Sequence, residues 1–156
     1  MRIGPESAAL FDAGSALVVG AVDPDGTPFA IRGWGAMLVD EGAALRVYVD
    51  ADDTEVVPRL TPSAPVAVTG GDVRTLRSAQ VKGTVRVLDE LSALDIATRE
   101  RATELFVQDV HETDHTPRDL LERMVPERFL GCTFDVTELF DQTPGPQAGA
   151  TLSADA

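Results

Sequence analysis

The fold is decided by residues 74–88, RTLRSAQVKGTVRVL, a segment without Asp or Glu in a chain whose formal net charge is -13. From Ser78 onward, polar and apolar residues alternate, as they do in a β-strand that rests one face on a core. The polar face holds Ser78, Gln80, Lys82, Thr84 and Arg86, and the apolar face holds Ala79, Val81, Gly83, Val85 and Val87. The alternation therefore predicts a half-buried strand in the middle of the chain.

This segment also concentrates positive charge. It contains Arg74, Arg77, Lys82 and Arg86, and Lys82 is the only lysine of the chain. Two interpretations stay open: an ordinary strand whose polar face meets water, or a row of donors that lines a site for an anion. Gln80 and Lys82 in an Ala/Val-rich strand favour the anion site, because a local basic cluster can override the acidic field of the whole chain at short range.

Short strands joined by turns fill the chain before this segment. Two of them, residues 16–22 (ALVVGAV) and 28–39 (PFAIRGWGAMLV), flank an Asp-Pro-Asp-Gly sequence whose Pro and Gly favour a hairpin turn. Further strands are predicted at 45–50, with Arg46 and Tyr48 outward, and at 65–69, and short helices at 5–12 and 53–60. Strands at such close spacing indicate an antiparallel sheet or barrel instead of β-α-β units.

The strand at 28–39 carries two glycines around the only tryptophan, Trp34. Its alternation places Arg32, Trp34 and Ala36 on one face. Gly33 and Gly35 predict either a β-bulge or a place where something flat approaches the backbone closely. Trp34 is accordingly either a neighbour of that molecule or an aromatic residue of the core.

Two helices and a strand are predicted after Leu88. Asp89 can cap a helix that extends to about residue 110, with Leu94 on its apolar face and Val107 off that face. Thr116 and Pro117 suit the start of a second helix, to about residue 125, and residues 129–136 form a final strand. We expect a single domain over residues 1–141 and a flexible C-terminal tail over 142–156, which is rich in Pro, Gly and Ala.

Composition excludes several classes of protein. A net charge of -13 argues against nucleic acid and anionic membranes as partners, because the general field repels both. No apolar run approaches the ~18 residues of a membrane span and no signal sequence is recognisable, so we expect a cytoplasmic protein. Cys132, the single cysteine, is predicted to be a small buried hydrophobe. His111 and His115 have a helical i, i+4 spacing, but no convincing further ligands lie nearby in the sequence, so no metal site is predicted.

The order of elements resembles the pyridoxamine 5'-phosphate oxidase-related proteins, the FMN-binding split-barrel family. The resemblance is carried by ALVVGAV, the DPDG turn, PFAIRGWGAML, PVAVT and, above all, TLRSAQVKGTV followed directly by a long helix. It covers about residues 10–138. It implies a mainly β fold, a six-stranded antiparallel split β-barrel with peripheral helices, and a homodimer that binds FMN in the groove between its subunits.

The resemblance also implies a cofactor site. The strand that holds Arg77, Ser78, Gln80 and Lys82 contacts phosphate, ribityl chain or ring edge in such proteins, and the strand that holds Arg32, Gly33, Trp34 and Gly35 lies beside the ring. Because a guanidinium group binds phosphate oxygens in pairs, Arg74 or Arg77 suits the phosphate better than Lys82 does.

These features predict an FMN-dependent oxidoreductase that acts on an undefined small-molecule substrate through unassigned catalytic residues. The paired Arg and Lys motif and the basic C-terminal segment of true pyridoxamine phosphate oxidases are missing, so that activity itself is not expected. Two alternatives stay open. One is a non-catalytic protein that binds a small molecule or a cofactor without turnover, or that has no cofactor, and the other is a reductase that uses the deazaflavin F420 on the same fold.

Overall fold

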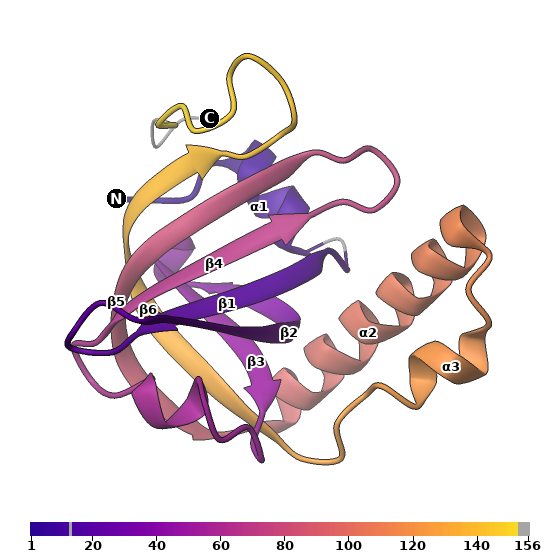
Figure 1. Cartoon of the computed structure of the whole chain (residues 1–156), viewed down its shortest axis with the longest axis horizontal. Coiled ribbons are helices and arrows are strands. Elements are labelled where there is room, and N and C mark those ends of the chain that lie inside the picture. The colour runs from indigo at the N-terminus through magenta and orange to yellow at the C-terminus, as the bar shows by residue number, and fades with distance from the viewer. Residues whose placement is uncertain (13, 153–156) are drawn as a thin grey trace.

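Six antiparallel strands close into a barrel in the order β1-β2-β3-β6-β5-β4 (Figure 1). The structure, a computed structural model, describes residues 1–12 and 14–152. The strands are β1 (Ala16–Val22), β2 (Pro28–Val39), β3 (Ala44–Asp50), β4 (Pro65–Gly71), β5 (Ser78–Glu90) and β6 (Phe129–Asp141). Pairing of β1 with β4 closes the barrel, which confirms the predicted antiparallel split-barrel fold with peripheral helices.

Three α-helices of the described residues lie outside the barrel. The helix α1 (Pro5–Asp12) lies behind the strands at the upper end in Figure 1, whereas α2 (Ala93–Asp114) and α3 (Arg118–Glu122) flank one side. None of the helices in the described residues is both long and apolar enough to cross a bilayer.

The prediction of a helix over residues 53–60 is wrong. Only a 3-10 turn, η2 (Val57–Arg59), forms there. The reason is local, because the carboxylate of Asp53 accepts the backbone N–H groups of Glu55, Val56 and Val57. An Asp side chain that binds the following backbone in this way competes with helix formation.

The barrel interior is filled by every second residue of the strands. Leu17 and Val19 of β1, Leu45, Val47 and Val49 of β3, and Phe134 of β6 are all at most 1% exposed. Phe11 from α1, also 1% exposed, belongs to the same cluster. The strand alternation seen in the sequence therefore corresponds to an inside and an outside of the barrel.

A β-bulge interrupts β2 where the two glycines predict one. The pairing of β2 with β3 shifts between Gly33 and Ala36, and Gly35 has a positive φ of 110°. Because a bulge adds one residue, the alternation reverses after it. Ala36 thus belongs to the core, at 2% exposure, and the prediction that it shares a face with Arg32 is wrong.

The helix α2 starts later than predicted. Its N-cap is Ser92 rather than Asp89, and Ser92 and Asp95 form a reciprocal capping box. The face that α2 buries is also different, since Val107 is 2% exposed and Leu94 is 63% exposed. The second predicted helix shortens to α3, which has no side-chain cap.

The last strand is longer than predicted and the chain then turns back along it. Leu152 donates its backbone N–H to the carbonyl of Leu139 at 2.8 Å, and Asp141 donates to Ala150 at 2.9 Å. Residues 153–156 of the expected tail lie outside the described residues. The flexibility of this tail stays a prediction.

Candidate functional site

Among the described residues, no helix covers one outer face of the barrel. It is formed by β1, β4, β5 and the first half of β2, which lie toward the viewer in Figure 1. The register of the sheet aligns two rows across these strands: Ala30, Gly20, Ala67 and Lys82, and next to them Val18, Thr69 and Gln80. The second row ends at Arg32 of β2, which is not part of this face because it lies beneath α2. Neither row contains an acid, although the chain has 26 Asp and Glu residues. We call these rows, together with Val22 and Thr84, the acid-free face.

A groove of about 570 Å³ runs over the acid-free face. Its floor includes the small residues Gly20, Ala30 and Ala67, with Lys82 at one side and Glu138 of β6 beyond it. Ligand pockets in proteins typically occupy ~300–1,000 Å³. Because Gly20, Ala30 and Ala67 carry no large side chain, a flat molecule can approach these strands closely here.

Gln80 and Lys82 are the polar groups of this face. Gln80 donates from Nε2 to the Thr69 hydroxyl at 3.0 Å, which fixes the amide and leaves a second N–H and the carbonyl free for a ligand. Lys82 Nζ lies 4.7 Å from the centroid of the Phe140 ring. Among the described residues Lys82 has no ion-pair partner. The acid-free face therefore offers two hydrogen-bond donors, one of them charged.

The other predicted residues of this segment lie elsewhere. Arg74 Nε is 2.6 Å from Asp109 of α2, and Arg74 also pairs with Glu112. Arg77 pairs with Glu6 of α1 at 3.1 Å. The Ser78 hydroxyl donates to the backbone carbonyl of Leu76 at 3.3 Å. The structure thus joins Gln80 and Lys82 on one surface and directs both arginines toward acids on the helices.

The four predicted residues of β2 lie beneath α2. Trp34 is 6% exposed, and the Arg32 guanidinium carbon is 4.7 Å from the Trp34 ring centroid and 3.8 Å from that of Phe106 on α2. A Cβ atom on Gly35 would lie 2.9 Å from the Cβ of Ala102, and one on Gly33 would meet Leu17 at the same distance. These glycines let β2 pack closely against both the helix and the barrel core.

The residues of the acid-free face fit the ring of a flavin. Lys82 and Gln80 can donate to the carbonyl edge of such a ring, and Gly20, Ala30 and Ala67 leave space for its flat face. A phosphate group would have to take Arg77 from Glu6. Both partners of that pair are exposed, at 56% and 70% of their side chains, so the exchange costs at most about 1 kcal/mol.

Sequence reasoning missed the floor of the groove. Gly20, Ala30 and Ala67 belong to strands that were predicted, but which residues of these strands lie next to Lys82 depends on the register between strands. The signal available in the sequence was the small size of residues at outward positions of the predicted strands, which indicates a floor that a ligand can approach.

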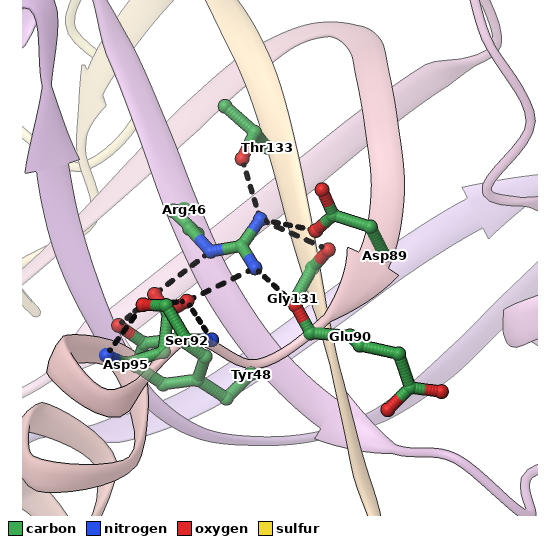
Figure 2. A network of polar contacts seen from close by, with 8 residues as sticks. All are labelled: Arg46, Tyr48, Asp89, Glu90, Ser92, Asp95, Gly131 and Thr133. Carbon is green, nitrogen blue, oxygen red and sulfur yellow. Dashed lines mark hydrogen bonds and ion pairs between the residues drawn. The ribbon is translucent and has the colours of Figure 1, made fainter.

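A buried ion-pair network outside the predicted site attaches α2 to the barrel (Figure 2). Arg46 Nε donates to Asp95 at 2.9 Å, and its terminal nitrogens reach Thr133, Asp89 and the backbone carbonyls of Glu90 and Gly131.

Asp95 is 3% exposed and also accepts from Tyr48 at 3.1 Å. Burial alone would raise the pKa of Asp95, but the bonds from Arg46 and Ser92 outweigh it and lower that pKa to about 2. The outward positions of Arg46 and Tyr48 were predicted, but their burial by α2 was not.

The cysteine and the two histidines form no second reactive centre. Cys132 is fully buried, and burial raises the pKa of its thiol to about 12, so it is protonated at neutral pH. His111 Nδ1 lies 2.8 Å from the backbone carbonyl of Thr116. In the described part of the chain, no three His, Cys, Asp or Glu side chains gather as a metal site.

Comparison with solved structures identifies the class of fold. HupZ of group A Streptococcus superposes with a TM-score of 0.56 at 17% identity, over 94% of this chain and 99% of that one. A protein of the pyridoxinephosphate oxidase family from Clostridium acetobutylicum, related to general stress protein 26, gives 0.54 at 16%, over 96% and 93%. An F420 reductase gives 0.54 at 15%, over 88% and 98%.

These similarities show that the chain has the split-barrel fold of the pyridoxamine 5'-phosphate oxidase-related proteins. At such low identities the likeness concerns the fold alone. No protein-family model matches the sequence, and no curated protein matches it.

Proposed function

We propose that this protein is an oxidoreductase that binds a flavin-type cofactor, FMN or a deazaflavin, on the acid-free face at the interface of two copies of the chain. The observation that carries the proposal is a groove floor that includes the small residues Gly20, Ala30 and Ala67, bordered by Lys82 and with Glu138 as the single acid of its lining. Gln80, two residues before Lys82 on β5, adds a second donor in the neighbouring row. In a chain of net charge -13, a surface with a lysine and a single acid repels the negative charge of a reduced ring less than an acid-rich surface does.

The two donors have separate roles in the proposal. Lys82 faces the ring edge and stabilises negative charge that develops there on reduction. Gln80, held by Thr69, donates a neutral hydrogen bond and orients the ring. A second copy of the chain over the groove would exclude water from it, which would strengthen both interactions. The cofactor, when bound, supplies the electron or hydride transfer.

The proposal is tested by titrating the purified protein with FMN and, separately, with F420, and following absorbance and melting temperature. Lys82→Gln should weaken binding of the preferred cofactor by about ten- to a hundredfold, because a charge-assisted hydrogen bond contributes ~1.5–3 kcal/mol. Arg86→Gln is the matched control. Arg86 lies on the same strand, but it pairs with Asp40 and Asp135 outside the groove. Binding of neither cofactor would overturn the proposal.

A non-catalytic binder on the same face is distinguished by turnover. Arg74 and Arg77 are paired with acids on the helices. This favours the second candidate, because neither arginine is free to bind the phosphate of a cofactor unless its ion pair breaks. Steady oxidation of a nicotinamide or deazaflavin donor by the loaded protein, with a substrate or oxygen as acceptor, rules it out. The substrate is proposed to be a small molecule, and a cytoplasmic location remains part of the proposal.

A further inference from the structure

A small pocket lies between β2 and α2, apart from the groove of the acid-free face. Its volume is about 10 Å³, which accommodates one atom of the size of water. The lining includes Ser15, Arg32 and Trp34 from the barrel and Thr103 and Phe106 from α2, and no acid is among the lining residues.

Two polar atoms in this pocket lack partners. Arg32 Nε and Thr103 Oγ1 are both buried, and neither has a hydrogen-bond partner among the described residues. These are a cationic N–H donor and a hydroxyl group, and both belong to the same pocket lining. A buried donor that is left without an acceptor costs free energy, more so when it is charged. An acceptor placed in the pocket would satisfy both groups at once.

The charge of Arg32 is also uncompensated. Every other arginine in the described residues lies within 4.0 Å of an acidic side chain, but Arg32 has no such partner. Burial lowers the pKa of its guanidinium group, which is the direction expected when no anion offsets the lost hydration. In an acidic protein, an unpaired and half-buried arginine is a candidate for binding an anion.

The two aromatic rings do not remove the need for an acceptor. Arg32 lies over the rings of Trp34 and Phe106, and such contacts offset part of the cost of burying the charge. The N–H groups of a guanidinium lie in its plane, where they bind the two oxygens of an oxyanion side by side. Nε of Arg32 is buried and has no hydrogen-bond partner among the described residues, so an oxyanion that meets Nε with one oxygen would place its second oxygen beside a terminal nitrogen of the same group.

We propose that the pocket beneath α2 is an oxyanion site, in which Arg32 and the Thr103 hydroxyl bind a carboxylate or phosphate group. One oxygen of the ligand enters the pocket and contacts Nε and Thr103, and a second contacts a terminal nitrogen of Arg32. This site is separate from Lys82, and its existence does not depend on the proposed cofactor. Its ligand is either a free small anion or the anionic end of a larger molecule.

Trp34 provides the readout, because it is the only tryptophan and lies against Arg32. The full chain is titrated with sodium phosphate and with sodium acetate, with sodium chloride keeping the ionic strength constant, and Trp34 emission is recorded. We expect a saturable change with at least one oxyanion. Thr103→Val should weaken it by about two- to tenfold, as expected for one neutral hydrogen bond, and Arg32→Gln and Arg32→Lys should abolish it.

Arg99→Gln is the matched control and should leave the response unchanged. Arg99 also lies over an aromatic ring, Phe129, and its side chain is largely buried, but it does not line this pocket. If Arg32→Gln fails to fold, Thr103→Val alone still tests the site. No saturable response in the wild type beyond that of chloride, or an unchanged response in Thr103→Val and Arg32→Lys, would overturn the proposal.

Competition separates the two sources of the anion, and both outcomes support the site. Phosphate that weakens FMN binding in the wild type, but not in Arg32→Lys, assigns the pocket to the phosphate end of the cofactor. Phosphate that binds equally well with FMN present assigns it to a separate ligand. Failure of FMN to bind leaves the phosphate and acetate titrations intact, so the oxyanion site and the proposed function fail independently.

Discussion

At the scale of single residues, Asp95 shows how one carboxylate joins several elements. It caps α2 through Ser92, pairs with Arg46 of β3 and accepts from Tyr48. Asp95→Asn should lower the free energy of unfolding by about 3–5 kcal/mol at pH 7, because it leaves Arg46 buried without its main counter-charge. Chemical denaturation measures the loss.

The same residue predicts a pH dependence. The pKa of Asp95 in the folded state, about 2, lies below its ordinary value of 3.8, so its contribution is complete above about pH 4 and is lost as the pH falls toward 2. The difference in unfolding free energy between wild type and Asp95→Asn should therefore shrink by about 2 kcal/mol over this range. Asp135→Asn, which removes an exposed partner of Arg86, should cost at most about 1 kcal/mol. A constant difference between wild type and Asp95→Asn from pH 5 to 2 would contradict the assignment.

At the scale of elements, the bulge in β2 determines how closely α2 packs. Gly35 combines a φ of 110° with a Cβ position only 2.9 Å from Ala102, whereas Gly26, with a φ of 88°, has nothing within 4 Å. Gly26→Ala should thus cost only the backbone strain, about 1–2 kcal/mol. Gly35→Ala should cost clearly more, because the helix must also move. Urea denaturation compares the two variants, and equal losses would mean that α2 does not press on the bulge.

The strands could be predicted from the sequence, but the contacts between elements could not. β1 and β2 match their predicted bounds because alternation and the turn at Asp23–Gly26 are local signals. The start of α2 was missed because both Asp89 and Ser92 can cap a helix; in the structure Ser92 forms a capping box with Asp95, which also pairs with Arg46. Likewise, nothing near Arg74 in the sequence reveals that it pairs with Asp109 and Glu112, which lie more than thirty residues away. The basic segment was therefore recognised, but its division between two surfaces was not.

At the scale of the whole molecule, the acidic charge is unevenly distributed. The acid-free face exposes Val18 at 50% and Val22 at 39%, and an exposed apolar surface of this kind is typical of an interface. The proposed homodimer would cover it. Two copies that associate there avoid the repulsion that their acidic faces would cause.

Val18→Lys tests that arrangement. The substitution places a charge in the centre of the proposed interface in both copies, where desolvation and like-charge repulsion oppose association. Wild type should have about twice the chain mass of 16.6 kDa in sedimentation or light scattering, and Val18→Lys should have the mass of one chain.

Val87→Lys is the control, because Val87 is exposed at 37% on β5 outside the acid-free face, and it should remain dimeric. If cofactor binding requires both copies, Val18→Lys should also lose FMN or F420 binding while keeping its melting temperature without cofactor. A wild type that stays monomeric at all concentrations, or a Val18→Lys variant that stays dimeric, would place the interface elsewhere.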